Sequence, residues 1–145
     1  MSYSRTMLSL SFTSLALLFT TMLIGTYVDA SHQGMSCPGW PLCPNGFSFP
    51  PKKYLFEEIH RIMALVTTFA IVSTAIYAAK KTEQIKTQAV AAGGVVVVQV
   101  ILGMFVVYTK LEALVVAIHL TTGVLLFGLS LITFVSYYRL SNAEL

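Results

Sequence analysis

Four long apolar segments constrain this 145-residue chain more than any other feature of its sequence. They cover approximately residues 7–28, 54–79, 87–109 and 112–138. Each segment is long enough to cross a bilayer, because a membrane-spanning helix needs about 20 residues. Only 10% of the residues are charged, whereas a typical soluble domain has about 25%. The sequence therefore predicts an all-α integral membrane protein.

The connections between these segments are short, except for the loop over residues 29–53. Short connections favour an up-down-up-down four-helix bundle, which would form a single membrane domain over residues 1–145. We expect the first helix to be retained, because its apolar run is longer than the roughly 7–15 residues of a signal-peptide core.

Lysine and arginine residues indicate the orientation of the bundle. One side collects Arg5, Lys80, Lys81, Lys86 and Arg139, and the other has Lys52, Lys53 and Lys110. Because these residues are enriched in cytoplasmic loops, we expect both termini to be cytoplasmic and the 29–53 loop to be extracytoplasmic. We expect a multi-pass protein of the cell membrane. The net charge of +3 is too small to indicate nucleic-acid binding.

Glycines on the third and fourth predicted helices indicate close packing. Gly93 and Gly94 lie on the third helix, and Gly123 and Gly128 lie on the fourth. Small residues allow neighbouring helices to approach each other in lipid. Gly103 lies nearer the outer end of the third helix, where a missing side chain could equally admit a flat ligand.

A cluster of ionisable residues opens the second predicted helix. Glu57, Glu58, His60 and Arg61 directly precede a long uncharged run. Ionisable groups in a membrane helix are costly and usually mark a functional site. The alternative is a collar in which Glu58 and Arg61 lie among lipid headgroups, and we favour that interpretation for Glu58.

Two histidines have matching depths in the predicted bundle. His60 and His119 follow the starts of the second and fourth helices, both of which enter from the outer face. At ~1.5 Å of rise per residue, both imidazoles lie roughly 9–10 Å below the helix starts. Such a pair can supply both axial ligands of a haem. Alternatively, each histidine only hydrogen-bonds a backbone carbonyl or lines a wet crevice. Zinc is disfavoured, because no third or fourth ligand lies at this depth.

Glu57 precedes His60 by one helical turn, so the two residues share a helix face. Beside a cofactor, this carboxylate could act as a proton donor, a proton acceptor or a charge stabiliser. The alternative is a headgroup-level residue in water. His32 follows the first helix, and we expect it to face solvent.

The loop contains two cysteines, Cys37 and Cys43, within a Pro/Gly-rich segment. On the non-cytoplasmic side they can close a small disulfide ring. The ring could fix a lid over the mouth of the bundle, or it could be a redox-active pair.

Four motifs give the chain a resemblance to the haem A synthase family of respiratory membrane proteins. They are Gly34-x-x-Cys37-x-x-Trp40-Pro41-Leu42-Cys43-x-x-Gly46 in the loop, Glu57-x-x-His60-Arg61 on the second helix, Gln99-x-x-Leu102-Gly103-x-x-Val106-Val107 on the third and His119-Leu120 on the fourth. The match covers nearly the whole chain. The resemblance implies oxidation of a porphyrin methyl group of haem O to the formyl group of haem A, which haem-copper oxidases use.

The resemblance also implies a set of site residues. They are His60 and His119 as axial ligands of the haem iron, Glu57 as the catalytic carboxylate, Arg61, Gln99 and Gly103 as further haem-binding residues, and Cys37 and Cys43 as the outer-loop pair. The cofactor would be haem O as substrate and haem A as product, with a haem b left open.

Family members usually have eight helices in two similar halves, one for the substrate haem and one for a haem b. This sequence shows one four-helix unit that resembles the amino-terminal half. A homo-oligomer would rebuild the two-fold arrangement, so we expect a homodimer or a higher oligomer. Candidate protein partners are a haem O synthase and an oxidase-assembly protein.

Three other functional classes remain open. A bis-histidine membrane b-type cytochrome would use His60 and His119 for electron transfer alone, but it would leave Glu57 and the cysteines without a role. A thiol oxidase that reduces quinone normally needs a second cysteine pair, and this chain has two cysteines in total. A non-catalytic assembly subunit is the third alternative.

Overall fold

The computed structural model describes residues 4–46 and 48–142. Within these residues the long helices are α1 (Arg5–Ala30), α2 (Leu55–Lys81), α3 (Lys86–Tyr108) and α4 (Ala113–Asn142). A short 3-10 turn, η1 (Glu83–Ile85), joins α2 to α3. The described part of the chain contains no strand. The predicted all-α bundle is confirmed, with helix ends that differ from the expected ones by a few residues.

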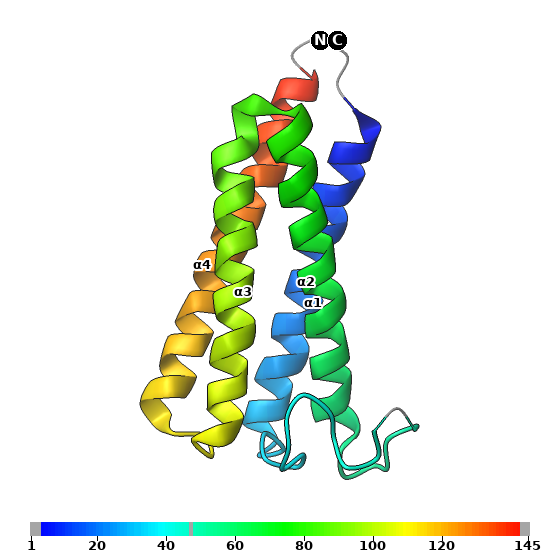
Figure 1. Ribbon diagram of the computed structural model, residues 1–145, viewed down its shortest axis with the longest axis vertical. Coiled ribbons are helices and arrows are strands. Elements are labelled where there is room, and N and C mark those ends of the chain that lie inside the picture. The colour runs from blue at the N-terminus through cyan, green and yellow to red at the C-terminus, as the bar shows by residue number, and fades with distance from the viewer. Residues whose placement is uncertain (1–3, 47, 143–145) are drawn as a thin grey trace.

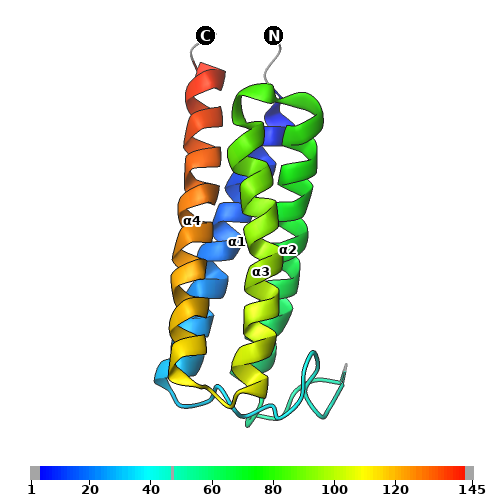
Figure 2. The same cartoon turned by 60° about the vertical axis from the view of Figure 1, so that its left-hand side comes forward.

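The four helices pack in a closed ring. The neighbouring pairs are α1 with α2, α2 with α3, α3 with α4, and α4 with α1. We call the end that carries the α1–α2 loop and the α3–α4 connection the loop end, and the opposite end, which carries η1, the turn end (Figure 1). Helix α1 begins and α4 ends at the turn end, as Figure 2 also shows. The cytoplasmic location of the turn end stays a prediction.

All four helices are long and apolar enough to cross a membrane. At most 28% of the spanning window of any helix is buried inside the bundle, so most side chains face outward. Large apolar side chains such as Phe69 and Leu114 are among those exposed. In lipid this exposure carries no hydrophobic penalty, because the acyl chains are as apolar as the side chains. The chain is therefore a multi-pass membrane protein.

Two apolar clusters fill the inside of the bundle. The cluster at the turn end consists of Met7, Ala78, Ile85, Ala89 and Tyr137. The second cluster consists of Leu18, Ile71, Ala92, Val96 and Leu126. Each cluster has members from α1, α2, α3 and α4, so both clusters hold the four helices together.

The glycines of α3 and α4 divide into two groups. A Cβ atom on Gly93 would lie 2.9 Å from the Cβ of Ala75, so this glycine permits the close approach of α2 and α3. A Cβ on Gly123 would lie 3.2 Å from Gln99 Nε2. Added Cβ atoms on Gly94 and Gly128 would meet nothing within 4 Å. The expectation of close packing is therefore wrong for Gly94 and Gly128, which face away from their neighbours.

Buried hydroxyl pairs join α1 to α2. The hydroxyls of Ser14 and Thr74 are 2.9 Å apart, and those of Thr21 and Thr67 are 2.7 Å apart. All four residues are buried. Interhelical hydrogen bonds of this kind contribute about 0.6–2 kcal/mol each in membrane bundles. The hydrogen bond between Thr21 and Thr67 holds α1 against α2 about two helical turns along α2 from His60.

Candidate functional site

His60 lies near the start of α2 and its imidazole contacts α1. Its Nδ1 is 3.1 Å from the backbone carbonyl oxygen of Thr21. If Nδ1 carries the proton and donates it to this carbonyl, Nε2 keeps its lone pair and can bind a metal. Thr21 thus supplies the second partner that a ligating histidine requires.

Gly25 lies one turn along α1 from Thr21 and faces the same imidazole. A Cβ atom at this position would be 2.6 Å from His60 Cε1 and 3.1 Å from His60 Nδ1. Real Cβ atoms essentially never approach this closely, so a larger residue would displace the ring. Thr21 and Gly25 therefore form one cradle for His60, a role that no pattern in the sequence indicated for either residue.

His119 lies near the start of α4, where two predicted site residues of α3 contact it. The Nε2 of Gln99 donates to the His119 carbonyl oxygen at 3.1 Å and lies 3.4 Å from His119 Nε2. A Cβ atom on Gly103 would be 3.4 Å from His119 Cε1, which is an ordinary contact distance. The structure thus brings Gln99, Gly103 and His119 together.

His60 is the sixth residue of α2 and His119 is the seventh residue of α4. Both side chains are half-buried, and both helices begin at the loop end, α2 at Leu55 and α4 at Ala113. His60 and His119 therefore share one end of the bundle, and their equal depth stays a prediction.

The surroundings of the two rings fit a haem. His119 Nδ1 and Gln99 Oε1 are buried, and neither has a hydrogen-bond partner among the described residues. Leaving such an atom unpaired costs about 1–3 kcal/mol, so the site is better explained with a group that supplies partners or ligands. Gly25 and Gly103 also leave both imidazoles free of crowding side chains. Histidines on two helices of one bundle are suitable axial ligands of a haem.

Glu57 is buried, and its carboxylate binds the loop. One oxygen forms an ion pair with Arg61, with Oε1 2.6 Å from a guanidinium nitrogen. The other accepts hydrogen bonds from the Ser36 hydroxyl at 2.7 Å and from the Cys37 backbone N–H at 2.8 Å. We call the contacts of Glu57 and Arg61 with residues 36–41 the loop clasp.

Arg61 completes the loop clasp through three backbone carbonyls. Its guanidinium donates to Gly39 at 2.5 Å, to Cys37 at 3.3 Å and to Pro41 at 3.4 Å. In the same loop Cys37 and Cys43 form a disulfide bond, and both cysteines are buried. The expected ring is therefore present and closes over the start of α2. The predicted role of Arg61 in cofactor binding stays a prediction.

Glu58 follows Glu57 in the first turn of α2, and its carboxylate contacts a different part of the loop. It is only 5% exposed and accepts a hydrogen bond from Asn45 Nδ2 at 3.0 Å. The expectation that Glu58 lies among lipid headgroups is wrong, because the loop folds back over this carboxylate. His32 is exposed, as expected.

Comparisons with known proteins identify the family. Residues 47–144 match the family described as cytochrome oxidase assembly protein. A protein named Heme A synthase from Bacillus licheniformis is 33% identical over 135 residues, which are 89% of this chain and 42% of that protein. A second Heme A synthase, from Lysinibacillus sphaericus, is 31% identical over 120 residues, 77% of this chain and 38% of the relative. The chain spans about two fifths of the length of these relatives. It belongs to the haem A synthase family of cytochrome oxidase assembly proteins.

Proposed function

We propose that the chain forms a haem A synthase site, in which His60 and His119 ligate the iron of haem O. The reaction would oxidise a porphyrin methyl group to the formyl group of haem A. The family match and the names of the two relatives support this proposal. The observation that supports it best is that His60 on α2 and His119 on α4 are both half-buried near the loop end of one bundle.

The residues of the chain have distinct parts in this proposal. A bound haem O supplies the redox-active iron and the methyl group. The Thr21 carbonyl orients His60, and Gln99 holds the backbone at His119. Glu57 remains the proposed catalytic carboxylate. Because its oxygens already accept bonds from Arg61, Ser36 and Cys37, it is placed to act through its fixed charge near the site.

The test is expression of the chain with a supply of haem O, followed by purification, a haem spectrum and chromatography of the extracted haem. We expect formyl-bearing haem from the wild type. His60→Ala and His119→Ala should each lose bound haem, whereas His32→Ala, at an exposed position, should retain it. Wild-type haem content in both ligand variants would refute the proposed ligation.

A bis-histidine cytochrome is the second candidate function, and the loop clasp removes the objection that Glu57 and the cysteines would have no role in it. The clasp gives Glu57 and the disulfide a structural role that an electron carrier could also use. Haem extraction from host membranes with and without the gene distinguishes the two functions. Loss of formyl-bearing haem without the gene supports synthesis, and unchanged haem A supports electron transfer.

We also propose that the chain assembles as a homo-oligomer. The relatives are more than twice as long as the aligned part, and closed symmetric pairs are the commonest assemblies. Light scattering of the protein in mild detergent measures the oligomeric state, and an active monomer would contradict the proposal. Copurification of this chain with a haem O synthase, or with an oxidase-assembly protein, would test whether either protein binds it.

A further inference from the structure

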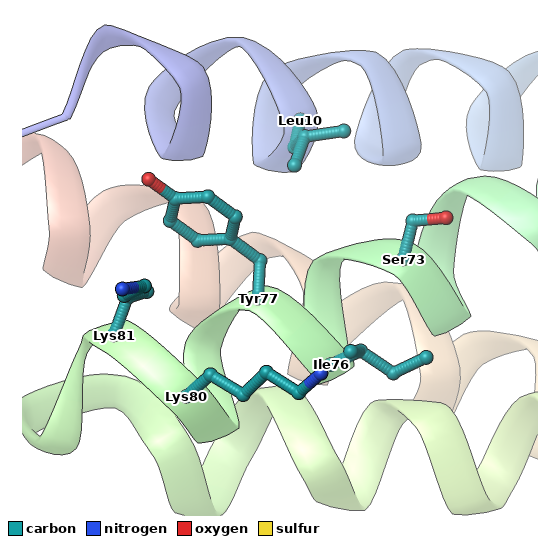
Figure 3. Close-up of a pocket in the computed structure, with 6 residues that line it drawn as sticks. All are labelled: Leu10, Ser73, Ile76, Tyr77, Lys80 and Lys81. Atoms are coloured by element: carbon teal, nitrogen blue, oxygen red, sulfur yellow. The ribbon is translucent and has the colours of Figure 1, made fainter.

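A groove lies between α1 and α2 at the turn end, far from the histidines. Its volume is about 350 Å³, and it is lined by Leu10, Ser73, Ile76, Tyr77, Lys80 and Lys81 (Figure 3). The wall is mainly apolar, and the two lysines stand at the end nearest η1. The groove therefore combines an apolar wall with a basic rim.

A second hollow continues this groove along α1. It is lined by Arg5, Thr6, Ser9, Leu10 and Thr13. Leu10 lines both hollows, so the two meet at this residue. Arg5 thus adds a third basic residue, from the first turn of α1, to the same side of the bundle.

The basic residues of the rim have no acidic partner among residues 4–46 and 48–142. Arg5, Lys80 and Lys81 are exposed, and none of them forms an ion pair with a described residue. Lys86 differs, because it pairs with Glu83 at 3.3 Å. Figure 3 shows the Lys80 side chain extending back along α2 toward Ile76. Its ammonium group therefore lies over the apolar wall, and no described carboxylate pairs with it.

We propose that this groove binds an anionic phospholipid. One acyl chain would lie along Leu10, Ser73 and Ile76, and the phosphate would bind between Lys80 and Lys81, with Arg5 beside it. In a spanning bundle the groove wall lies at the depth of acyl chains and the rim at the depth of headgroups. Basic pockets between membrane helices recognise acidic headgroups in this way. A zwitterionic lipid is disfavoured, because its own cation would be repelled by the rim.

The first test compares lipid retention in nanodiscs that contain phosphatidylcholine and phosphatidylglycerol. After release from the nanodiscs, native mass spectrometry counts the lipids that remain bound to the full chain. We expect wild-type protein to retain phosphatidylglycerol preferentially and Lys80→Gln/Lys81→Gln to retain several-fold less. Lys86→Gln is the matched control, because it removes a nearby turn-end charge that already has a partner. Equal retention by the double variant and the wild type would overturn the proposal.

The second test addresses the acyl-chain wall. Ser73→Phe fills the groove, and Val97→Phe adds the same ring at another exposed position, on α3. Both positions are exposed, so both variants should keep their helical circular dichroism. Loss of phosphatidylglycerol in Ser73→Phe alone supports the proposal. Undiminished retention in Ser73→Phe, or release of the lipid by inorganic phosphate alone, would overturn it. Neither test depends on haem, so the result is independent of the proposed function.

Discussion

The Nδ1 of His60 lies 3.1 Å from the carbonyl oxygen of Thr21, so α1 orients the proposed iron ligand of α2. None of the motifs that relate this chain to its family lies on α1. The helix nevertheless supplies a hydrogen-bond acceptor to the imidazole and, at Gly25, the space that the ring occupies. All four helices therefore contribute to the site, because Gln99 and Gly103 of α3 contact His119 on α4.

Gly25→Ala should reduce haem binding or shift the haem spectrum, because the new Cβ would lie 2.6 Å from His60 Cε1. Gly94→Ala is the control, because its Cβ would meet nothing within 4 Å. Both changes raise helix propensity by about 1 kcal/mol, so propensity does not separate them. Haem content and the absorption spectrum measure the effect. A Gly25→Ala protein with a wild-type spectrum would show that the cradle does not position His60.

Glu57→Gln should retain bound haem but fail to form the formyl group, if Glu57 acts through its charge. The change preserves the size of the side chain and removes the charge that pairs with Arg61. Haem content and extracted haem type, measured on the same preparation, separate the two effects. Full formyl formation by Glu57→Gln would show that the charge of Glu57 is not needed for the reaction.

Arg61→Gln should open the loop, because it leaves the buried Glu57 carboxylate without its ion-pair partner. Breaking a buried pair in this way costs about 3–5 kcal/mol. Limited proteolysis of residues 36–41 and the thermal unfolding midpoint measure the loss. Lys86→Gln breaks the exposed Glu83–Lys86 pair and should cost less than about 1 kcal/mol. Equal effects of the two substitutions would contradict the loop clasp.

Thr21→Val and Thr67→Val should show non-additive effects on stability, because their hydroxyls are 2.7 Å apart. We expect a coupling free energy of about 0.6–2 kcal/mol, the range for interhelical hydrogen bonds in membranes. A double-mutant cycle of unfolding in detergent measures it, and Ser14 with Thr74 offers a second hydroxyl pair for comparison. Strictly additive effects would indicate that the hydroxyl contact contributes nothing.

Gly103→Ala should fold normally and still lower the haem content. Its Cβ would lie 3.4 Å from His119 Cε1, a distance that needs no rearrangement of the bundle. Helix packing and access of a flat ligand are the two roles considered for this glycine from the sequence, and a methyl group would obstruct the second. Gly128→Ala, in open space on α4, is the control. Undiminished haem binding by Gly103→Ala would leave this glycine without a role in the site.

Part of the loop clasp had a signal in the sequence. Glu57 and Arg61 are four residues apart on one helix, a spacing at which opposite charges commonly pair. The spacing gave no information on the loop, because the other partners are a hydroxyl, a backbone N–H and three carbonyls. Such backbone groups occur at every position, so a sequence pattern does not distinguish the ones that will be used.

The sequence by itself determined the four spanning helices, because the thickness of a bilayer sets the length of each apolar segment. It also determined His60 and His119 as candidate ligands, since histidines are rare in such segments and these two follow equivalent helix starts. Only the tertiary structure decided that Thr21 and Gly25 form the cradle of His60, that Gly93 packs closely and Gly94 does not, and that the loop covers Glu58. The physical reason is that these features depend on the rotation of each helix about its axis, which the packing of all four helices sets together.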